Sequence, residues 1–320
     1  MGNVVVWKPS PYNVYASYLV HKVLLEAGLP SNRLFSITVA ALHFTGSSDV
    51  FRSLAGHIGR GIANRHYREY PRLVGETSGK NFHLVHPSAD IDSAVNHTIR
   101  EAFEYQGQKC SATSRLYIPV SKSEEFLGKL KASVEKATVG EPEKLNSFMG
   151  PVIHQASFDK IKSIIDKSNN DPSLELLTGG TYDNRTGYFV QRTIYVASNQ
   201  DHVLFNQEIF GPVLTVYVYP DNEWSPLLKD IDRAGGGFAS TGAVFASERA
   251  AIREADSALR YSADCKTTGA VIGQQSFGGG RASGTNDKAG SSNLLLRFTS
   301  PRTVKEEFIP LDDFRYPGNF

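Results

Sequence analysis

One of the two cysteines in this sequence lies on a polar, glycine-containing loop. Cys110 stands in Gln106-Gly-Gln-Lys-Cys-Ser-Ala112, between a helix-like run over 91–103 and an alternating, strand-like run over 114–120. A structural cysteine is usually a small buried hydrophobic residue in an apolar stretch, whereas a thiol among polar side chains can ionise and be reached by a substrate. A lone cysteine is a weak signal, so this loop by itself leaves catalysis and an incidental thiol equally open.

Two other segments each contain a carboxylate and a glycine. Glu76 follows a short apolar run in Leu73-Val-Gly-Glu-Thr-Ser-Gly-Lys-Asn81, and Glu208 lies in Phe205-Asn-Gln-Glu-Ile-Phe-Gly-Pro-Val213. Cys110 lies between them in the sequence, 34 residues after Glu76 (110 − 76). In this order and with this separation, the three segments resemble the aldehyde dehydrogenase superfamily.

The residues around Cys110 and a later run narrow the resemblance to one group within that superfamily. Gly107-Gln-Lys-Cys-Ser-Ala112, together with Gly269-Ala-Val-Ile-Gly-Gln-Gln-Ser-Phe277, is similar to the delta-1-pyrroline-5-carboxylate dehydrogenases. The similarity runs nearly end to end. It implies an NAD-dependent oxidation of glutamate γ-semialdehyde to glutamate in proline breakdown, through a cysteine thiohemiacetal and a thioester.

The chemistry that this resemblance implies needs a nucleophile and a base. A thiolate makes an aldehyde carbon tetrahedral so that hydride can leave it, and the resulting thioester is a good acyl donor to water. Cys110 is the expected nucleophile, and Glu76 is the expected base for the thiol and for the water. The alternative for Glu76 is a carboxylate that only caps a turn. No cluster of His, Cys and Asp has the spacing of metal ligands, so no metal is expected.

Five residues are expected at the cofactor. By resemblance, Lys8 hydrogen-bonds the adenosine ribose of NAD, Gly46 and Ser47 lie at its pyrophosphate and nicotinamide side, and Glu208 accepts hydrogen bonds from the nicotinamide ribose, with Phe210 packed nearby. Small residues at a helix start can also place backbone N–H groups against phosphate. The alternatives are a solvated lysine, an ordinary serine N-cap and a surface carboxylate.

Four residues are expected to select the substrate. An α-carboxylate needs several hydrogen-bond donors together, and Ser111 with the Gly269–Ala270 turn would supply a hydroxyl and two N–H groups. Phe277 would pack on the aliphatic chain. The second cysteine, Cys265, has no carboxylate spaced as Glu76 is, and we interpret it as incidental.

The whole chain describes an ordinary globular protein. It has 320 residues, 40% hydrophobic and 21% charged, with a formal net charge of +1. This balance argues against nucleic acid or an anionic membrane surface as a partner, and no apolar run approaches the roughly 18 residues of a membrane span. The expected partner is a small-molecule substrate. Two cysteines favour a reducing compartment, and the resemblance implies the mitochondrial matrix in a eukaryote or otherwise the cytoplasm.

The pattern of elements predicts an α/β fold. A buried strand over 4–7 and a helix over 14–27 form a βα unit, followed by strand-like runs over 34–39 and 41–45. A helix from Ser47 to about Ile62 and a strand over 72–74 complete this half. Residues 1–75 are therefore expected to form an incomplete Rossmann-type NAD-binding domain.

The second half alternates helices and strands. The expected helices span 91–103, 123–138, 155–167 and 248–261, and the expected strands span 116–120, 175–177 and 213–219. Residues 76–284 are assigned to a catalytic domain. Residues 285–320, with strand-like runs at 294–299 and 304–308, are assigned to a C-terminal arm that by resemblance pairs with another subunit, giving a homo-oligomer.

Compared with the resembled family, three segments are expected to be missing: outer strands before Met1 with an asparagine of the oxyanion hole, a crossover near 36–39, and a strand near 263–265. Losing one oxyanion donor typically costs about a hundredfold to a thousandfold in rate. A second hypothesis therefore stands beside the dehydrogenase, namely an inactive fragment or a non-catalytic partner subunit of that family.

Overall fold

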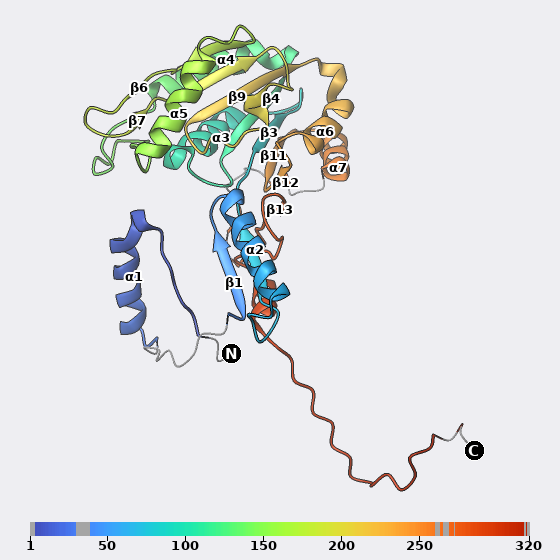
Figure 1. Ribbon diagram of the computed structural model, residues 1–320. Coiled ribbons are helices and arrows are strands. Elements are labelled where there is room, and N and C mark those ends of the chain that lie inside the picture. Colours follow the sequence, from blue (N-terminus) through green and yellow to red (C-terminus); the bar gives the residue numbers. More distant parts are fainter. Residues whose placement is uncertain are drawn as a thin grey trace.

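The computed structural model describes residues 4–29, 39–259, 263–264, 269–271, 273–316 and 318. Its main body is a seven-stranded sheet in the order β12-β11-β3-β4-β9-β8-β5 (Figure 1). Every neighbouring pair is parallel except β5 with β8. The strands are β3 Asn81–Val85, β4 Thr113–Pro119, β5 Leu174–Thr178, β8 Thr193–Ala197, β9 Val213–Tyr219, β11 Gly242–Phe245 and β12 Ala263–Asp264.

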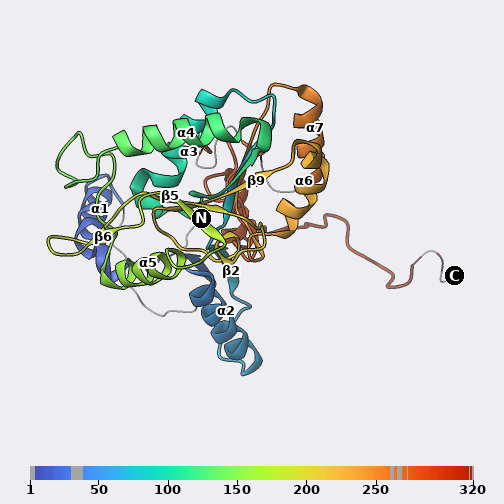
Figure 2. The ribbon, with the colours of Figure 1, turned by 90° about the horizontal axis from the view of Figure 1, so that it is seen from above.

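Helices cover both faces of this sheet (Figure 2). Side chains alternate along a strand, so Leu116 and Ile118 pack under α3 and α4, whereas Tyr117 packs toward α6 and α7. Tyr195 of β8 packs under α5 on that second face. The five helices are α3 Ile91–Phe103, α4 Val120–Lys136, α5 Gln155–Ser168, α6 Trp224–Arg233 and α7 Arg249–Ala258.

A second, two-stranded parallel sheet lies below the main one in Figure 1. It pairs β1 (Ala41–Thr45) with β2 (Arg72–Glu76), and α2 (Ser48–Ala63) connects the two strands. Parallel neighbours need such a crossover connection. Glu76 is the last residue of β2, and five residues later β3 begins the main sheet.

The remaining described elements are short, apart from α1. They are η1 Pro11–Asn13, α1 Val14–Glu26, η2 Glu104–Gly107, β6 Tyr182–Asp183, β7 Phe189–Val190, η3 Val203–Phe205, η4 Asp221–Glu223, β10 Phe238–Ala239, β13 Gly280–Arg281, α8 Ser292–Leu295 and η5 Leu296–Phe298. Among the helices that the structure describes, none is both long and apolar enough to cross a membrane.

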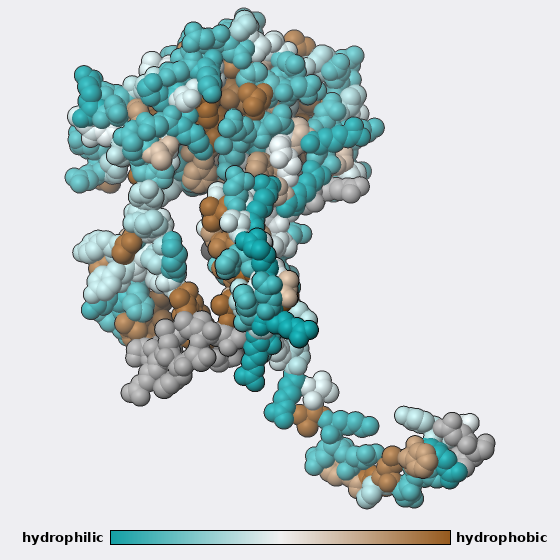
Figure 3. Space-filling model, in the orientation of Figure 1, coloured by the Kyte–Doolittle hydropathy of each residue, from teal (hydrophilic) through white to brown (hydrophobic). Residues whose placement is uncertain are grey.

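The expected buried strand over 4–7 is wrong. These residues form no strand, and Val4, Val5, Val6 and Trp7 are each at least half exposed. A strand exists through hydrogen bonds to a neighbouring strand, and no described strand pairs with residues 4–7, since the β1–β2 sheet has only those two strands. The helix that follows is confirmed as α1, but Ser17 is its one buried residue. Figure 3 shows this N-terminal segment below the main body, which it contacts where the Tyr12 ring packs on His154, with ring centroids 4.4 Å apart.

The expected closing strands over 294–299 and 304–308 are also wrong. The first run forms α8 and η5 and makes local bonds such as Leu294 N–H to Ser291 O, at 3.3 Å. The second run belongs to an extended tail that leaves the body (Figure 1). Apolar character favours a strand only where a partner backbone is available. The tail exposes most of the surface of Phe308, Ile309 and Phe314.

Within the main sheet the predictions hold better. The expected helix over 91–103 and strand over 213–219 are confirmed residue for residue as α3 and β9. The helix expected from Ser123 begins earlier, at Val120, because Pro119 already stands at its N-cap. Where a strand was expected to be missing, the two residues of β12 pair with β11. The run over 34–39 lies almost wholly outside the described residues.

Candidate active site

Four segments meet where the carboxyl edge of the β1–β2 sheet faces the amino edge of the main sheet. They are the link between β2 and β3, the loop before β4 that carries Cys110, the loop before β9 that carries Glu208, and the glycine-rich run around Gly279. Hydrogen bonds connect these segments: Gly79 N–H donates to Glu208, Asn81 at the start of β3 donates to the Cys110 carbonyl, and Gly279 N–H donates to Glu76. The site therefore lies at the junction of the two sheets.

Glu76 is buried, with 6% of its surface exposed. Its Oε2 accepts a 2.9 Å hydrogen bond from the Gly279 N–H, while Oε1 has no hydrogen-bond partner. Burial raises the pKa of this carboxyl, Asp287 raises it further, and the Gly279 bond and the Lys288 charge oppose the rise. A carboxyl with a raised pKa and a free oxygen is suited to accept a proton.

The Cys110 loop depends on left-handed backbone. Tyr105, Gln106 and Gly107 have φ values of 53°, 59° and 64°. A Cβ on Gly107 would lie 2.5 Å from the carbonyl oxygen of Gly211, so only glycine lets this loop contact the one before β9. The Cys110 loop and the Glu208 loop are thus packed backbone to backbone.

The Cys110 thiol is mostly buried and has a raised pKa. Burial is the main cause, and the carboxylates of Glu76 and Glu208 add to it. The backbone N–H groups of Cys110 and Ser111 act in the opposite direction and lower the pKa of the thiol. Both carboxylates therefore lie within electrostatic reach of the thiol, and the thiol stays protonated near neutral pH unless a base removes the proton.

Glu208 is held by the link between β2 and β3. Its Oε1 accepts a 2.7 Å hydrogen bond from the Gly79 N–H. Gly79 also touches the other side of the site, because a Cβ there would lie 2.0 Å from the Cys110 carbonyl oxygen. Phe210, two residues beyond Glu208, has a φ of 57° and is 37% exposed.

The start of α2 lies beside Glu76. Gly46 N–H donates to the Glu76 carbonyl at 3.2 Å, and Ser47 caps the helix by accepting from Val50 N–H at 3.3 Å. Ser48 N–H donates to Ser78 Oγ at 3.2 Å. A 16-residue helix that starts at the carboxyl end of a strand presents a positive dipole end, which suits a phosphate.

The remaining expected residues are placed less fully. Ser111 is half-buried beside Cys110, and Phe277 precedes Gly278, where a Cβ would lie 3.1 Å from Glu76 Oε1. Gly269 and Ala270 are half-buried, but residues on both sides of 269–271 lie outside the described chain, so their place at the substrate remains a prediction. Cys265 lies outside it too.

Lys8 is not placed at a strand end. It is exposed, and its Nζ donates to the neighbouring Pro9 carbonyl at 3.2 Å. The cause is the same as for residues 4–7, since the strand that would present Lys8 at its carboxyl end does not form. Its role at a ribose remains a prediction.

The sequence analysis gave no role to Gly79, Lys80 and Asn81, yet the structure places all three at the site. Gly79 touches both Cys110 and Glu208, Asn81 hydrogen-bonds the Cys110 loop, and Lys80 is almost completely buried. Burial, with the nearby Arg115 charge, lowers the pKa of Lys80 to about 7. The available signal was the run Thr77-Ser-Gly-Lys-Asn81, whose polar residues lead straight into a buried strand.

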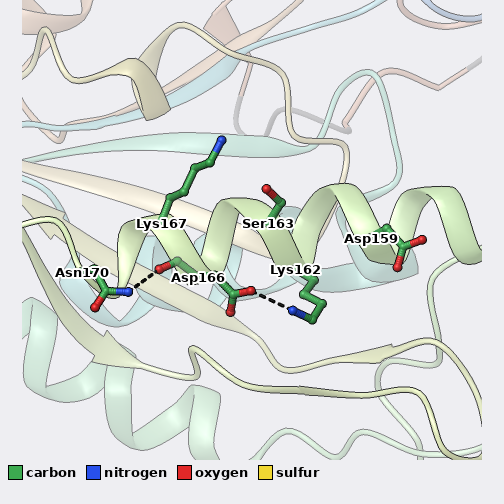
Figure 4. Close-up of a pocket in the computed structure, with 6 residues that line it drawn as sticks. All are labelled: Asp159, Lys162, Ser163, Asp166, Lys167 and Asn170. Carbon is green, nitrogen blue, oxygen red and sulfur yellow. Dashed lines mark hydrogen bonds and ion pairs between the residues drawn. The ribbon is translucent and has the colours of Figure 1, made fainter.

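A separate hollow lies on the outer face of α5 (Figure 4). All of its lining residues except Asn170 belong to that one helix, and Lys162 pairs there with Asp166 at 2.8 Å. Tyr182 also donates to Asp166, at 2.6 Å. These groups satisfy one another on a solvated surface, so the hollow is not a candidate for chemistry.

Comparisons with known proteins agree with this geometry. Residues 1–304 match the sequence profile of the aldehyde dehydrogenase family. The chain is 52% identical over 342 aligned residues to the mitochondrial delta-1-pyrroline-5-carboxylate dehydrogenase of Emericella nidulans, covering 100% of this chain and 60% of that protein. It is 47% identical to the probable delta-1-pyrroline-5-carboxylate dehydrogenase of Schizosaccharomyces pombe, covering 100% of this chain and 62% of that one.

Solved structures give the same result. The crystal structure of the Mycobacterium tuberculosis delta-pyrroline-5-carboxylate dehydrogenase bound with NAD has a TM-score of 0.89 and 40% identity, covering 100% of this chain and 62% of that one. The α/β fold expected from the sequence is confirmed. The chain spans about 60% of the length of these curated relatives.

Proposed function

Because the chain belongs to the aldehyde dehydrogenase family, we propose that it carries out the NAD-dependent oxidation of glutamate γ-semialdehyde to glutamate. The observation that supports this most is the convergence on one half-buried thiol, Cys110, of two carboxylates from separate segments, Glu76 and Glu208. Relatives whose names specify this activity, and one solved with NAD, add to the case.

In this proposal Cys110 forms the covalent bond. Glu76 takes the thiol proton, and the sulfur attacks the aldehyde carbon to give a thiohemiacetal. Loss of hydride from that carbon leaves a thioester on Cys110. Glu76 passes the first proton on to solvent and then removes a proton from water as the water attacks the thioester. The carboxylic acid leaves, and the Cys110 thiolate takes the proton back from Glu76 to restore the thiol. Burial suits Glu76 to both steps, because it raises the pKa of the carboxyl toward that of a useful base.

NAD, when bound, would accept the hydride. Residues that fit it lie at the start of α2, where Gly46 and Ser47 follow the carboxyl end of β1 and the helix dipole favours a phosphate. Glu208 and Phe210 would hold the nicotinamide side. Because Glu208 already accepts the Gly79 N–H, a ribose hydroxyl would share or replace that hydrogen bond. Lys8 would have to move to reach the adenosine.

The substrate would lie between Cys110 and the glycine-rich run. Phe277 is positioned to pack on an aliphatic chain, because the next residue adjoins Glu76. Ser111 and the Gly269–Ala270 turn would donate to the α-carboxylate. If the preference is real, glutamate semialdehyde should bind more tightly than a plain aliphatic aldehyde of similar length.

A covalent-trapping experiment tests the reaction. After brief exposure to glutamate semialdehyde and NAD, intact-mass spectrometry should show an acyl adduct that accumulates in Glu76→Gln, because thioester hydrolysis is blocked. Cys110→Ala should show no adduct, and Cys265→Ala should behave as the parent chain. An adduct that persists in Cys110→Ala would sink the assignment.

The second candidate is a non-catalytic partner subunit or an inactive fragment. It is favoured by the exposed apolar residues of 4–7 and of the C-terminal tail. For either candidate we propose that residues 285–320 associate with a second copy of the chain. We also propose that in a eukaryotic cell the protein works in the mitochondrial matrix, because the names of several relatives describe those proteins as mitochondrial. Stoichiometric NAD binding with turnover of several per second would exclude the non-catalytic partner subunit and the inactive fragment.

A further inference from the structure

The peptide plane between Cys110 and Ser111 is fixed by its carbonyl oxygen. Asn81 Nδ2 donates to that oxygen at 2.7 Å and to the Ala112 carbonyl at 2.9 Å. On another side the same oxygen lies against Gly79, where a Cβ would approach to 2.0 Å. The carbonyl therefore has little freedom to rotate.

Asn81 is itself rigidly held. It is 2% exposed, and its Oδ1 accepts from the Thr241 N–H at 3.1 Å. One amide oxygen that faces a backbone donor and one amide nitrogen that faces two carbonyls leave a single consistent orientation for the side chain. Asn81 thus ties three segments together: the start of β3, the Cys110 loop and the residues that lead into β11.

In a trans peptide the C=O and the N–H point in opposite directions. Holding the Cys110 carbonyl toward Asn81 consequently directs the Ser111 N–H to the opposite edge of the peptide plane, away from Asn81, and this N–H lowers the pKa of the Cys110 thiol. Resting on the proposed function, we propose that Asn81 is a positioning residue for the nucleophile, which acts by orienting the Cys110–Ser111 peptide so that its N–H stabilises the thiolate.

The other charged groups that face the thiol come from different segments. Among the described residues they are Glu76 at the end of β2 and Glu208 before β9, and both disfavour the thiolate. The N–H donors are what oppose them, so turning one donor away should be felt at the sulfur. Neither carboxylate is changed in the neutral Asn81 variants below.

The experiment measures the pH profile of Cys110 alkylation by iodoacetamide in the full chain carrying Cys265→Ser, with mass spectrometry as the readout. In Asn81→Ala and in the second neutral variant Asn81→Ser, the midpoint should move up by about one pH unit, a tenfold loss of thiolate at a given pH below it. With turnover, kcat should fall about tenfold while KM for NAD stays unchanged.

Asn169→Ala is the matched control. The Asn169 amide donates to the Gly180 carbonyl at 3.1 Å and its oxygen accepts from Tyr195, so the variant loses the same kind of donor away from the thiol. Its alkylation profile should equal that of the parent. An unchanged midpoint in both neutral Asn81 variants, even with a lower melting temperature, would overturn the proposal, because Asn81 would then be only structural. Alkylation needs neither NAD nor aldehyde, so this result is separable from failure of the proposed function.

Discussion

The backbone N–H of Gly79 donates a 2.7 Å hydrogen bond to Glu208 Oε1, and the same glycine lies against the carbonyl of Cys110. One residue without a side chain therefore sets the spacing between the candidate nucleophile and a carboxylate 98 positions away from it in the sequence. Only glycine allows this approach, because any Cβ at residue 79 would overlap the Cys110 carbonyl oxygen.

Gly79→Ala should consequently damage both stability and the site. The Cβ would force backbone apart, so we expect a loss of about 1–3 kcal/mol in the free energy of unfolding together with altered Cys110 alkylation. Gly128→Ala is the control, because nothing lies within 4 Å of its Cβ in α4; it should stabilise by about 0.5–1 kcal/mol. Urea denaturation compares the two, and equal effects would contradict the crowding argument.

The carboxylates around Cys110 should be visible in its titration. Both raise the pKa of the thiol, with Glu76 the larger contributor, so Glu76→Gln and Glu208→Gln should each shift the alkylation midpoint to lower pH, the first by more. Glu175→Gln, on the exposed part of β5, is the control and should leave it unchanged. An upward shift in either site variant would contradict the placement of these charges.

Lys80→Met should stabilise the protein in a pH-dependent way. The folded pKa of Lys80 is about 7, below the ordinary 10.5, so the unfolded chain binds more protons between these values and stability rises with pH across that window. Below pH 7 the buried Lys80 charge lowers the free energy of unfolding by its full amount. Lys80→Met removes that charge, so the variant should gain on the order of several kcal/mol in the free energy of unfolding. The gain should fade as the pH approaches 10.5.

Denaturant unfolding of Lys80→Met at pH 6, 8 and 10 measures this change. Lys167→Met, on the exposed face of α5, is the matched control and should show little difference at any of these pH values. A stability gain of Lys80→Met that is the same at all three would show that packing, rather than the buried charge, is responsible.

Core and tail should respond differently to the same truncation. Leu84 is fully buried in β3, whereas Leu311 is 75% exposed in the tail. Leu84→Ala should cost about 2–5 kcal/mol through lost burial and a cavity, and Leu311→Ala should stay within about 0.5 kcal/mol. Thermal melts of the isolated chain check the comparison, and a large loss from Leu311→Ala would show that the tail is packed in solution.

Sequence reasoning located the elements whose signals are local. The apolar period of α3 and the apolar run of β9 were enough to predict where each element begins and ends. The helix has a capping residue at its start and an apolar stripe along one face, and the strand is buried on both faces. Residues 4–7 and 304–308 have equally apolar runs and form no strand. A strand depends on a partner elsewhere, and no pattern within the run itself reports whether that partner is present.

The same limit applies at the site. Cys110, Glu76 and Glu208 were named because their three segments together resemble a known family, since the Cys110 loop by itself left catalysis open. Asn81 could not, because its role comes from two carbonyls 29 and 31 positions away and an N–H 160 positions away. Such contacts exist only once β3, β4 and β11 have assembled.

The distribution of buried residues has a consequence for how the chain opens. All members of the three hydrophobic clusters lie between Phe82 and Leu259, whereas α2 buries only Ser48, Ile58 and Gly61. Elements with few buried contacts open at lower free energy than a core. The amide hydrogens of β1, α2 and β2 should thus exchange with solvent before those of β4, and Glu76, the last residue of β2, is carried by the part that opens first while Cys110 stays with the part that opens last.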